Sequence, residues 1–171
     1  QVKAIEGMVL NTVMIVETKD LSRRYGNNLA LDNLNLEIPE GAIYGFIGPN
    51  GAGKTTTMRI LTTLLLPSSG QAWIAGHSVV GNRKKVRQVV GFMPDFFGVY
   101  DNLRSWEYLD FFASAYGIPS SRRATLTEEL LDLVGLSHKR DEFVMSLSRG
   151  MKQRLSLART MAHNPPLLIL D

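Results

Sequence analysis

Hydrophobic and polar residues alternate in the first part of the chain in the pattern of a half-buried strand. The apolar residues Leu34, Leu36 and Ile38 are separated by polar ones, and this two-residue period is typical of a strand with one covered face. The run at 42–47 is apolar almost throughout, which predicts a strand covered on both faces. We interpret the change as a passage from a peripheral antiparallel sheet into a central one.

Helical spacing begins after a glycine-rich turn. Met58, Leu61 and Leu65 recur at helical intervals and predict a helix over 54–66. Further helices are predicted at about 105–116, 121–134 and 148–163. Short strands bounded by turn residues are predicted at 71–75, 89–93 and 167–170. Strands and helices that alternate in this way indicate an α/β fold, into which a helical, aromatic-rich segment is inserted.

The aromatic residues of that segment have two interpretations. They form the core of a small helical subdomain, or some of them are exposed and receive a partner, which a large exposed apolar patch would favour. The residues are Phe96, Phe97, Tyr100, Trp106, Tyr108, Phe111, Phe112 and Tyr116.

The composition excludes several classes of chemistry. The 171 residues are 44% hydrophobic and 20% charged, as in ordinary globular proteins. The absence of cysteine excludes disulfides, Cys-ligated zinc and thiol nucleophiles. No apolar run approaches the ~18 residues of a membrane span. The 19 Lys and Arg against 16 Asp and Glu are a small excess, and with no nucleic-acid module beside them we expect no nucleic-acid partner.

The glycine-rich turn matches a phosphate-binding motif at every defined position. Glycines allow successive backbone N–H groups to turn toward phosphate oxygens, and the following helix adds its positive N-terminal dipole. Lys54 would bring a charge to the β and γ phosphates, and the Thr55 hydroxyl would coordinate Mg²⁺. The alternative is a plain turn before a helix, which the placement between a strand and a helix disfavours. The motif consists of Gly48, Pro49, Asn50, Gly51, Ala52, Gly53, Lys54 and Thr55.

Three segments together resemble the ATP-binding-cassette (ABC) ATPases, and specifically the ATP-binding subunits of ABC transporters. They are the phosphate loop, the segment LSRGMKQR at 147–154 and the segment LLILD at 167–171. The resemblance implies a P-loop NTPase (RecA-like) core with an N-terminal antiparallel β subdomain and an inserted α-helical subdomain at about 95–150. It also implies ATP and Mg²⁺ as cofactors, with Lys54 as catalytic residue and Thr56 beside Thr55 at the nucleotide.

The second segment corresponds to the LSGGQ motif of the family, which faces the γ phosphate bound by a second subunit. The resemblance therefore places Ser148, Arg149 and Gly150 at a nucleotide in trans. A plain N-cap role for Ser148 is compatible with this one. Arg149 replaces a usual glycine and Met151 a frequent glutamine, which points toward the exporter branch of multidrug and polysaccharide or lipid export.

Three more roles follow from the resemblance. Asp171 would be the Walker B aspartate that holds Mg²⁺, rather than a turn-forming strand end. Tyr25 would stack on the adenine ring, rather than lie on a surface turn. Asp95 would occupy the position of the family's glutamine near Mg²⁺ and the attacking water, although a carboxylate cannot donate as an amide does.

The implied protein is an exporter subunit, cytoplasmic and peripheral at the inner face of the membrane. We expect residues 1–13 to be an extension and 14–171 to be the ABC-type domain, with a transmembrane permease and a second cassette, identical or related, as partners. We further expect the sequence to stop at its Walker B aspartate, without the catalytic glutamate, the switch histidine and the last strands, and to bind nucleotide without efficient hydrolysis. The alternative is a soluble ABC-type ATPase in DNA repair or translation.

Overall fold

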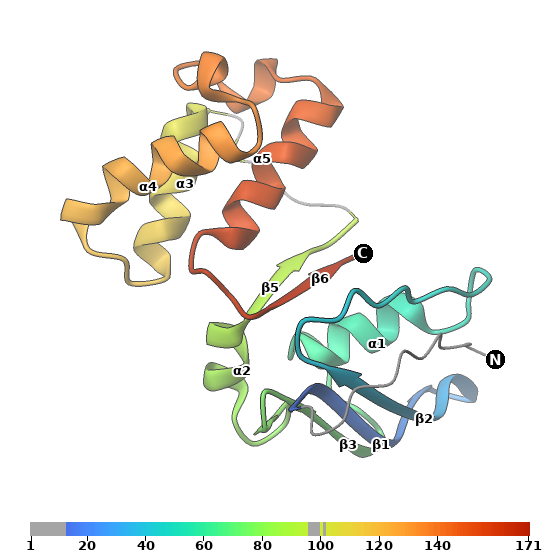
Figure 1. The fold of residues 1–171 in the computed structure, drawn as a ribbon. Coiled ribbons are helices and arrows are strands. Elements are labelled where there is room, and N and C mark those ends of the chain that lie inside the picture. Colours follow the sequence, from blue (N-terminus) through green and yellow to red (C-terminus); the bar gives the residue numbers. More distant parts are fainter. Residues whose placement is uncertain (1–12, 96–99, 101) are drawn as a thin grey trace. The chain divides into compact units, whose positions relative to one another are not determined.

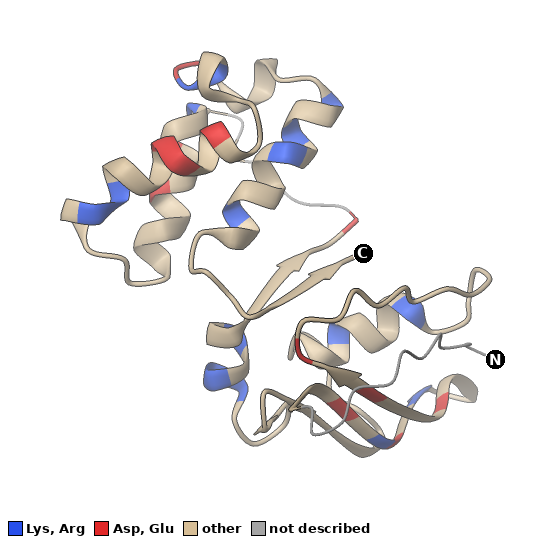
Figure 2. Cartoon of the chain, viewed as in Figure 1, with Lys and Arg blue, Asp and Glu red and all other residues tan. Residues whose placement is uncertain are grey.

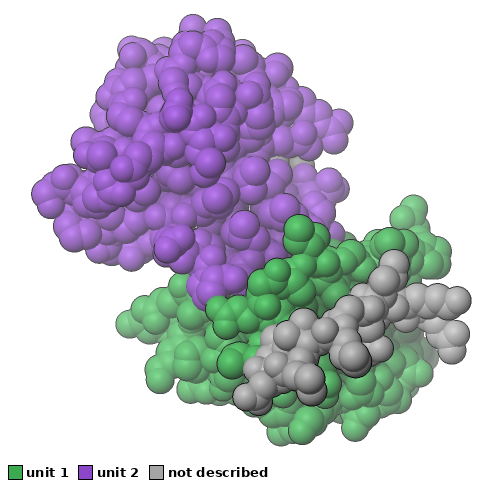
Figure 3. Space-filling model, in the orientation of Figure 1, with its two compact units in different colours: residues 1–90 green, residues 91–171 purple. Residues whose placement is uncertain are grey.

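The computed structural model describes residues 13–95, 100 and 102–171. The chain forms two compact units, residues 1–90 and 91–171 (Figures 1 and 3). The aromatic residues Phe96 and Phe97 lie outside the described residues.

The first unit is built on a four-stranded sheet. Its strands are β1 (Met14–Tyr25), β2 (Asn28–Pro39), β3 (Ser69–Ile74) and β4 (His77–Ser78), in the order β2-β1-β3-β4. Each neighbouring pair is antiparallel, as predicted for the N-terminal sheet. Its apolar face buries Val16, Leu21 and Ile74.

The prediction that 42–47 forms a strand covered on both faces is wrong. Within the described residues it forms no strand, and Ile43 and Ile47 are exposed. An extended segment becomes a strand only where a neighbouring strand pairs with its N–H and C=O groups. In the described part of the chain no strand pairs with this segment, so its apolar composition alone does not bury it.

The helix after the glycine-rich turn, α1 (Lys54–Leu61), ends five residues earlier than predicted. Its last turn closes because the N–H groups of Leu64 and Leu65 both donate to the carbonyl of Arg59. This closure places Thr63 in the left-handed region at φ 65, which a β-branched residue rarely adopts. Arg87 of α2 (Arg83–Val89) donates from Nε to the Thr63 hydroxyl at 2.8 Å and supports this end.

The second unit combines a two-stranded sheet with three helices. The strands are β5 (Val90–Met93) and β6 (Leu167–Leu170). The helices are α3 (Ser105–Ala115), α4 (Ser120–Leu133) and α5 (Arg149–Met161), with 3-10 turns η1 (Ser137–Lys139) and η2 (Val144–Ser146). The three predicted helices are confirmed to within a few residues. The apolar run of β6 is not buried: the exposed residues Leu168 and Leu170 alternate with the half-buried residues Leu167 and Ile169, as in a strand with one partly covered face.

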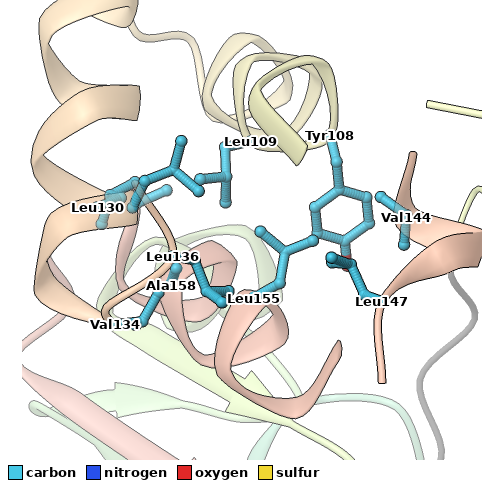
Figure 4. Close-up of a cluster of buried hydrophobic side chains, with 11 residues drawn as sticks. Tyr108, Leu109, Leu130, Val134, Leu136, Val144, Leu147, Leu155 and Ala158 are labelled. Atoms are coloured by element: carbon cyan, nitrogen blue, oxygen red, sulfur yellow. The ribbon is translucent and has the colours of Figure 1, made fainter. Parts of the chain in front are cut away.

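The core of the second unit lies between its three helices (Figure 4). Tyr108 and Leu109 of α3, Leu131 of α4 and Leu155 of α5 are fully buried there. Burial raises the pKa of the Tyr108 phenol, and the nearby charge of Arg159 opposes that rise. None of the described helices combines the length and apolar character that a membrane crossing requires.

Candidate functional site

The glycine-rich loop enters α1 through a backbone conformation that depends on glycine. Gly51 and Gly53 have φ of 83 and 88, in the left-handed region that side chains disfavour. A Cβ on Gly53 would lie 2.5 Å from the carbonyl oxygen of Ala30 on β2. The loop therefore fits against β2 only with glycine at this position, and Gly53 serves as the N-cap of α1.

The N-terminus of α1 is arranged to attract an anion. Gly53 provides no side-chain cap, and the first turn contains no acidic residue. The Lys54 Nζ donates to the carbonyl oxygens of Gly48 at 2.6 Å and Pro49 at 2.8 Å, so the ammonium group lies against the loop itself. Backbone N–H groups at a helix start together with a lysine ammonium are the donors that a phosphate requires.

The side chains around this loop also suit a magnesium-bound nucleotide. Thr55 is exposed and Thr56 half-buried at the start of α1. Among the described residues no group of three or more histidine or acidic side chains forms a metal cage. Magnesium is usually held by one or two protein ligands together with phosphate oxygens and water, so single hydroxyl and carboxylate groups fit this ion when it arrives with a nucleotide.

Tyr25 lies at the end of β1 and belongs to the same unit as the loop. Its side chain is 44% exposed, as a residue that stacks on a base must be. The guanidinium carbon of Arg23 lies 4.7 Å from the centre of its ring. One face of the ring is therefore occupied by Arg23.

Ser148 caps the helix α5 in the second unit. Its hydroxyl oxygen accepts a hydrogen bond from the Met151 N–H at 3.3 Å, which confirms the N-cap interpretation. Arg149 and Gly150 follow in the exposed first turn. α5 carries basic residues and no acidic ones (Figure 2), so its N-terminus has no carboxylate of its own to offset the helix dipole.

The two candidate metal carboxylates belong to one end of the two-stranded sheet. Asp171 directly follows β6, and its N–H donates to the Met93 carbonyl at 2.9 Å. Asp95 lies two residues after Met93, the last residue of β5, and both aspartates are exposed. The end of this sheet therefore brings together two residues that are 76 positions apart in the chain numbering, whose relation the sequence analysis could assign only through the resemblance.

The structure thus groups the predicted residues by unit. The phosphate loop, Lys54, Thr55, Thr56 and Tyr25 belong to the first unit; Asp95, Ser148, Arg149, Gly150 and Asp171 belong to the second. Sequence reasoning missed Arg23, because nothing in the pair Arg23-Arg24 shows which of the two side chains covers the tyrosine.

These features define a P-loop nucleotide-binding protein of mixed α/β fold. The family model "ABC transporter" matches residues 31–171, and the chain belongs to this family. The structure is similar to a solved structure titled "Structure of ATP binding subunit of ABC transporter", with a TM-score of 0.82 and 29% sequence identity, covering 92% of this chain and 65% of that one.

Curated relatives support the same family at higher identity. The bacitracin transport ATP-binding protein BcrA of Bacillus licheniformis is 43% identical over 92% of this chain and 50% of its own length. The daunorubicin/doxorubicin resistance ATP-binding protein DrrA of Streptomyces peucetius is 37% identical over 91% of this chain and 47% of its own. The chain spans about half the length of these two relatives.

Proposed function

We propose that the chain binds ATP with Mg²⁺ as part of the ATP-binding subunit of an ABC exporter. The observation that carries the proposal is the loop at 48–53, with its left-handed glycines, its uncapped helix start and the Lys54 ammonium against the loop carbonyls. The names of BcrA, a bacitracin transport protein, and DrrA, a daunorubicin/doxorubicin resistance protein, support export over a soluble role in DNA repair or translation.

Each residue of the site has a distinct role in this proposal. The loop N–H groups and Lys54 bind the phosphates and stabilise the charge that develops on transfer to water. Thr55 and Asp171 hold Mg²⁺, with Asp95 as a further ligand. Thr56 contacts the phosphates beside Thr55, and Tyr25 stacks on the adenine.

Ser148, Arg149 and Gly150 act on the nucleotide of a second cassette, identical or related. The Ser148 hydroxyl already accepts from Met151 but keeps its own proton, which it can donate to a phosphate oxygen. The exposed basic first turn of α5 supports an anionic ligand there. ATP would then lie between two cassettes, and hydrolysis is an activity of the whole assembled protein.

The partner in the membrane is a transmembrane permease subunit, which places the protein at the inner face of the membrane. Exposed aromatic side chains in the helical segment support the proposal of this partner. Tyr108 is fully buried, whereas Tyr100, Phe111 and Tyr116 are exposed. The rings of Tyr100 and Phe111 lie edge to face, with 5.4 Å between the ring centres. In this scheme residues 14–171 form the ATP-binding domain, with a helical subdomain at about 95–150 and residues 1–13 as an extension.

Nucleotide binding by a Lys54→Ala variant tests the proposal. Removing the ammonium leaves the loop backbone in place but takes away the positive charge that binds the phosphates. We therefore expect Mg-ATP affinity to fall by at least about tenfold, the equivalent of roughly 1.4 kcal/mol. Isothermal titration with Mg-ATP measures it. Arg59→Ala, at an exposed position in the last turn of the same helix, is the matched control. Equal affinity in the Lys54→Ala variant and the unchanged protein would contradict the proposal.

A further inference from the structure

The Arg23 guanidinium lies over one face of the Tyr25 ring. The Arg23 guanidinium carbon is 4.7 Å from the ring centre, a distance at which a cation is attracted to the face of an aromatic ring. Tyr25 nevertheless remains 44% exposed. A ring with one face on a guanidinium and substantial exposure elsewhere can still accept a flat partner.

The Arg23 guanidinium is hydrogen-bonded to a residue that lies far from it in the sequence. Its Nη1 donates to the carbonyl oxygen of Leu66 at 3.0 Å. Its Nε is buried and has no hydrogen-bond partner among the described residues. A buried donor without a partner is unfavourable, so the position of this side chain is maintained by the Leu66 contact and the ring rather than by complete hydrogen bonding.

The anchor belongs to the segment that leaves the phosphate-binding helix. Leu66 follows the end of α1, and two more hydrogen bonds join the same segment to the end of β1. Arg24 N–H donates to the Ser68 hydroxyl at 3.0 Å, and Ser68 N–H donates to the Ser22 carbonyl at 2.8 Å. The end of β1 that carries Tyr25 is therefore tied to the segment that follows α1, the helix whose other end carries the phosphate loop.

We propose that Arg23 is a positioning residue for the adenine ring: it holds Tyr25, tethered through Leu66, at a set place relative to the phosphate loop. The inference rests on the proposed function, because it takes Tyr25 as the surface on which the base stacks. Arg23 does not touch the ligand. It reduces the number of orientations that the exposed ring samples, so that less freedom is lost when a base binds.

The test compares a ligand that has a base with one that has none. Mg-ATP and magnesium tripolyphosphate are titrated into the unchanged protein and its Arg23→Ala variant. We expect Arg23→Ala to weaken ATP binding by about three- to tenfold, within the range that ordering one side chain on binding can cost, and to leave tripolyphosphate binding unchanged. Arg24→Ala, the exposed neighbour, is the matched control and should change neither. Tripolyphosphate binding also shows that the variant has folded its phosphate loop.

A double variant separates positioning from a general effect on the fold. If Arg23 acts through the ring, the double variant with Tyr25→Ala binds ATP as weakly as Tyr25→Ala alone. Additive losses, or equal losses for ATP and tripolyphosphate, would overturn the inference. So would a Tyr25→Ala variant with normal ATP affinity, although the phosphate site would stand. Failure of Lys54→Ala to weaken either ligand would instead contradict the proposed function itself.

Discussion

The helices α1 and α5 begin in two different ways, although both starts are candidate phosphate sites. α1 follows a glycine in the left-handed region and has no side-chain cap. α5 follows Ser148, whose hydroxyl accepts from the Met151 N–H. Neither first turn contains an acidic residue; that of α1 contains Lys54, and that of α5 contains Arg149 and Lys152.

The difference shows two ways to prepare an anion site. At α1 the anion site is formed by the backbone: glycines orient the loop, and the N-cap residue Gly53 has no side chain that could accept from the N–H groups of the helix start. At α5 one N–H is already paired, and the site depends on the hydroxyl proton of Ser148 and on nearby cations. Cations at a helix start are unfavourable for the helix alone, so both starts gain from an anion, and the first should be harder to alter without loss.

Gly53→Ala should produce the largest effect. The substitution forces a side chain into the left-handed region, which costs about 1–2 kcal/mol, and its Cβ would meet the Ala30 carbonyl at 2.5 Å. We expect lower stability in urea unfolding and loss of measurable Mg-ATP binding. Gly51→Ala is the matched control, because its φ is similar at 83 but no atom lies within 4 Å of its Cβ. Equal defects in the two variants would show that the contact with β2 contributes nothing.

Ser148→Ala should have a medium effect. Loss of an N-cap side chain typically costs about 1 kcal/mol, and the variant also loses the hydroxyl proton proposed to reach a phosphate. Ser148→Asp separates these two effects, because aspartate restores the cap but repels an anion. We expect normal unfolding stability in Ser148→Asp together with weakened ATP-dependent assembly of two cassettes, measured by light scattering. Normal assembly would leave Ser148 as a cap alone.

The sequence predicted the three helices of the second unit and the phosphate loop because their determinants are local. The loop motif spans eight adjacent positions, and glycine at 53 is required by a backbone angle that the structure confirms at φ 88. The three helices of the second unit have regular apolar spacing. Gly135 follows the end of α4, where it adopts φ 65 and its N–H donates to the Asp132 carbonyl, as glycine commonly does at the C-terminus of a helix.

Features that depend on distant partners could not be predicted. β1 shows no regular alternation, because register shifts interrupt its pairing with β2 at several places, and bulges break the two-residue period. The segment 42–47 has the composition of a buried strand but no pairing strand in the described residues. The early end of α1 depends on Thr63 in a conformation usually reserved for glycine, and the place of Arg23 depends on a carbonyl 43 residues away.

Arg149 gives the smallest expected effect and the sharpest test of the comparison, because charge at the start of α5 acts in opposite directions on the free helix and on a bound anion. Arg149→Glu places a negative charge near the positive end of the dipole, which should stabilise the chain by about 0.3–1 kcal/mol at low salt. The same substitution should weaken ATP-dependent assembly, and Arg149→Gln should lie between the unchanged protein and Arg149→Glu in both stability and assembly.

Urea unfolding at low salt and at about 1 M salt, where the Debye length falls to about 3 Å, measures the gain in stability, which should shrink as salt rises. A variant that is destabilised at low salt, or that assembles with ATP as well as the unchanged protein, would show that this helix start does not depend on an anion as the start of α1 does.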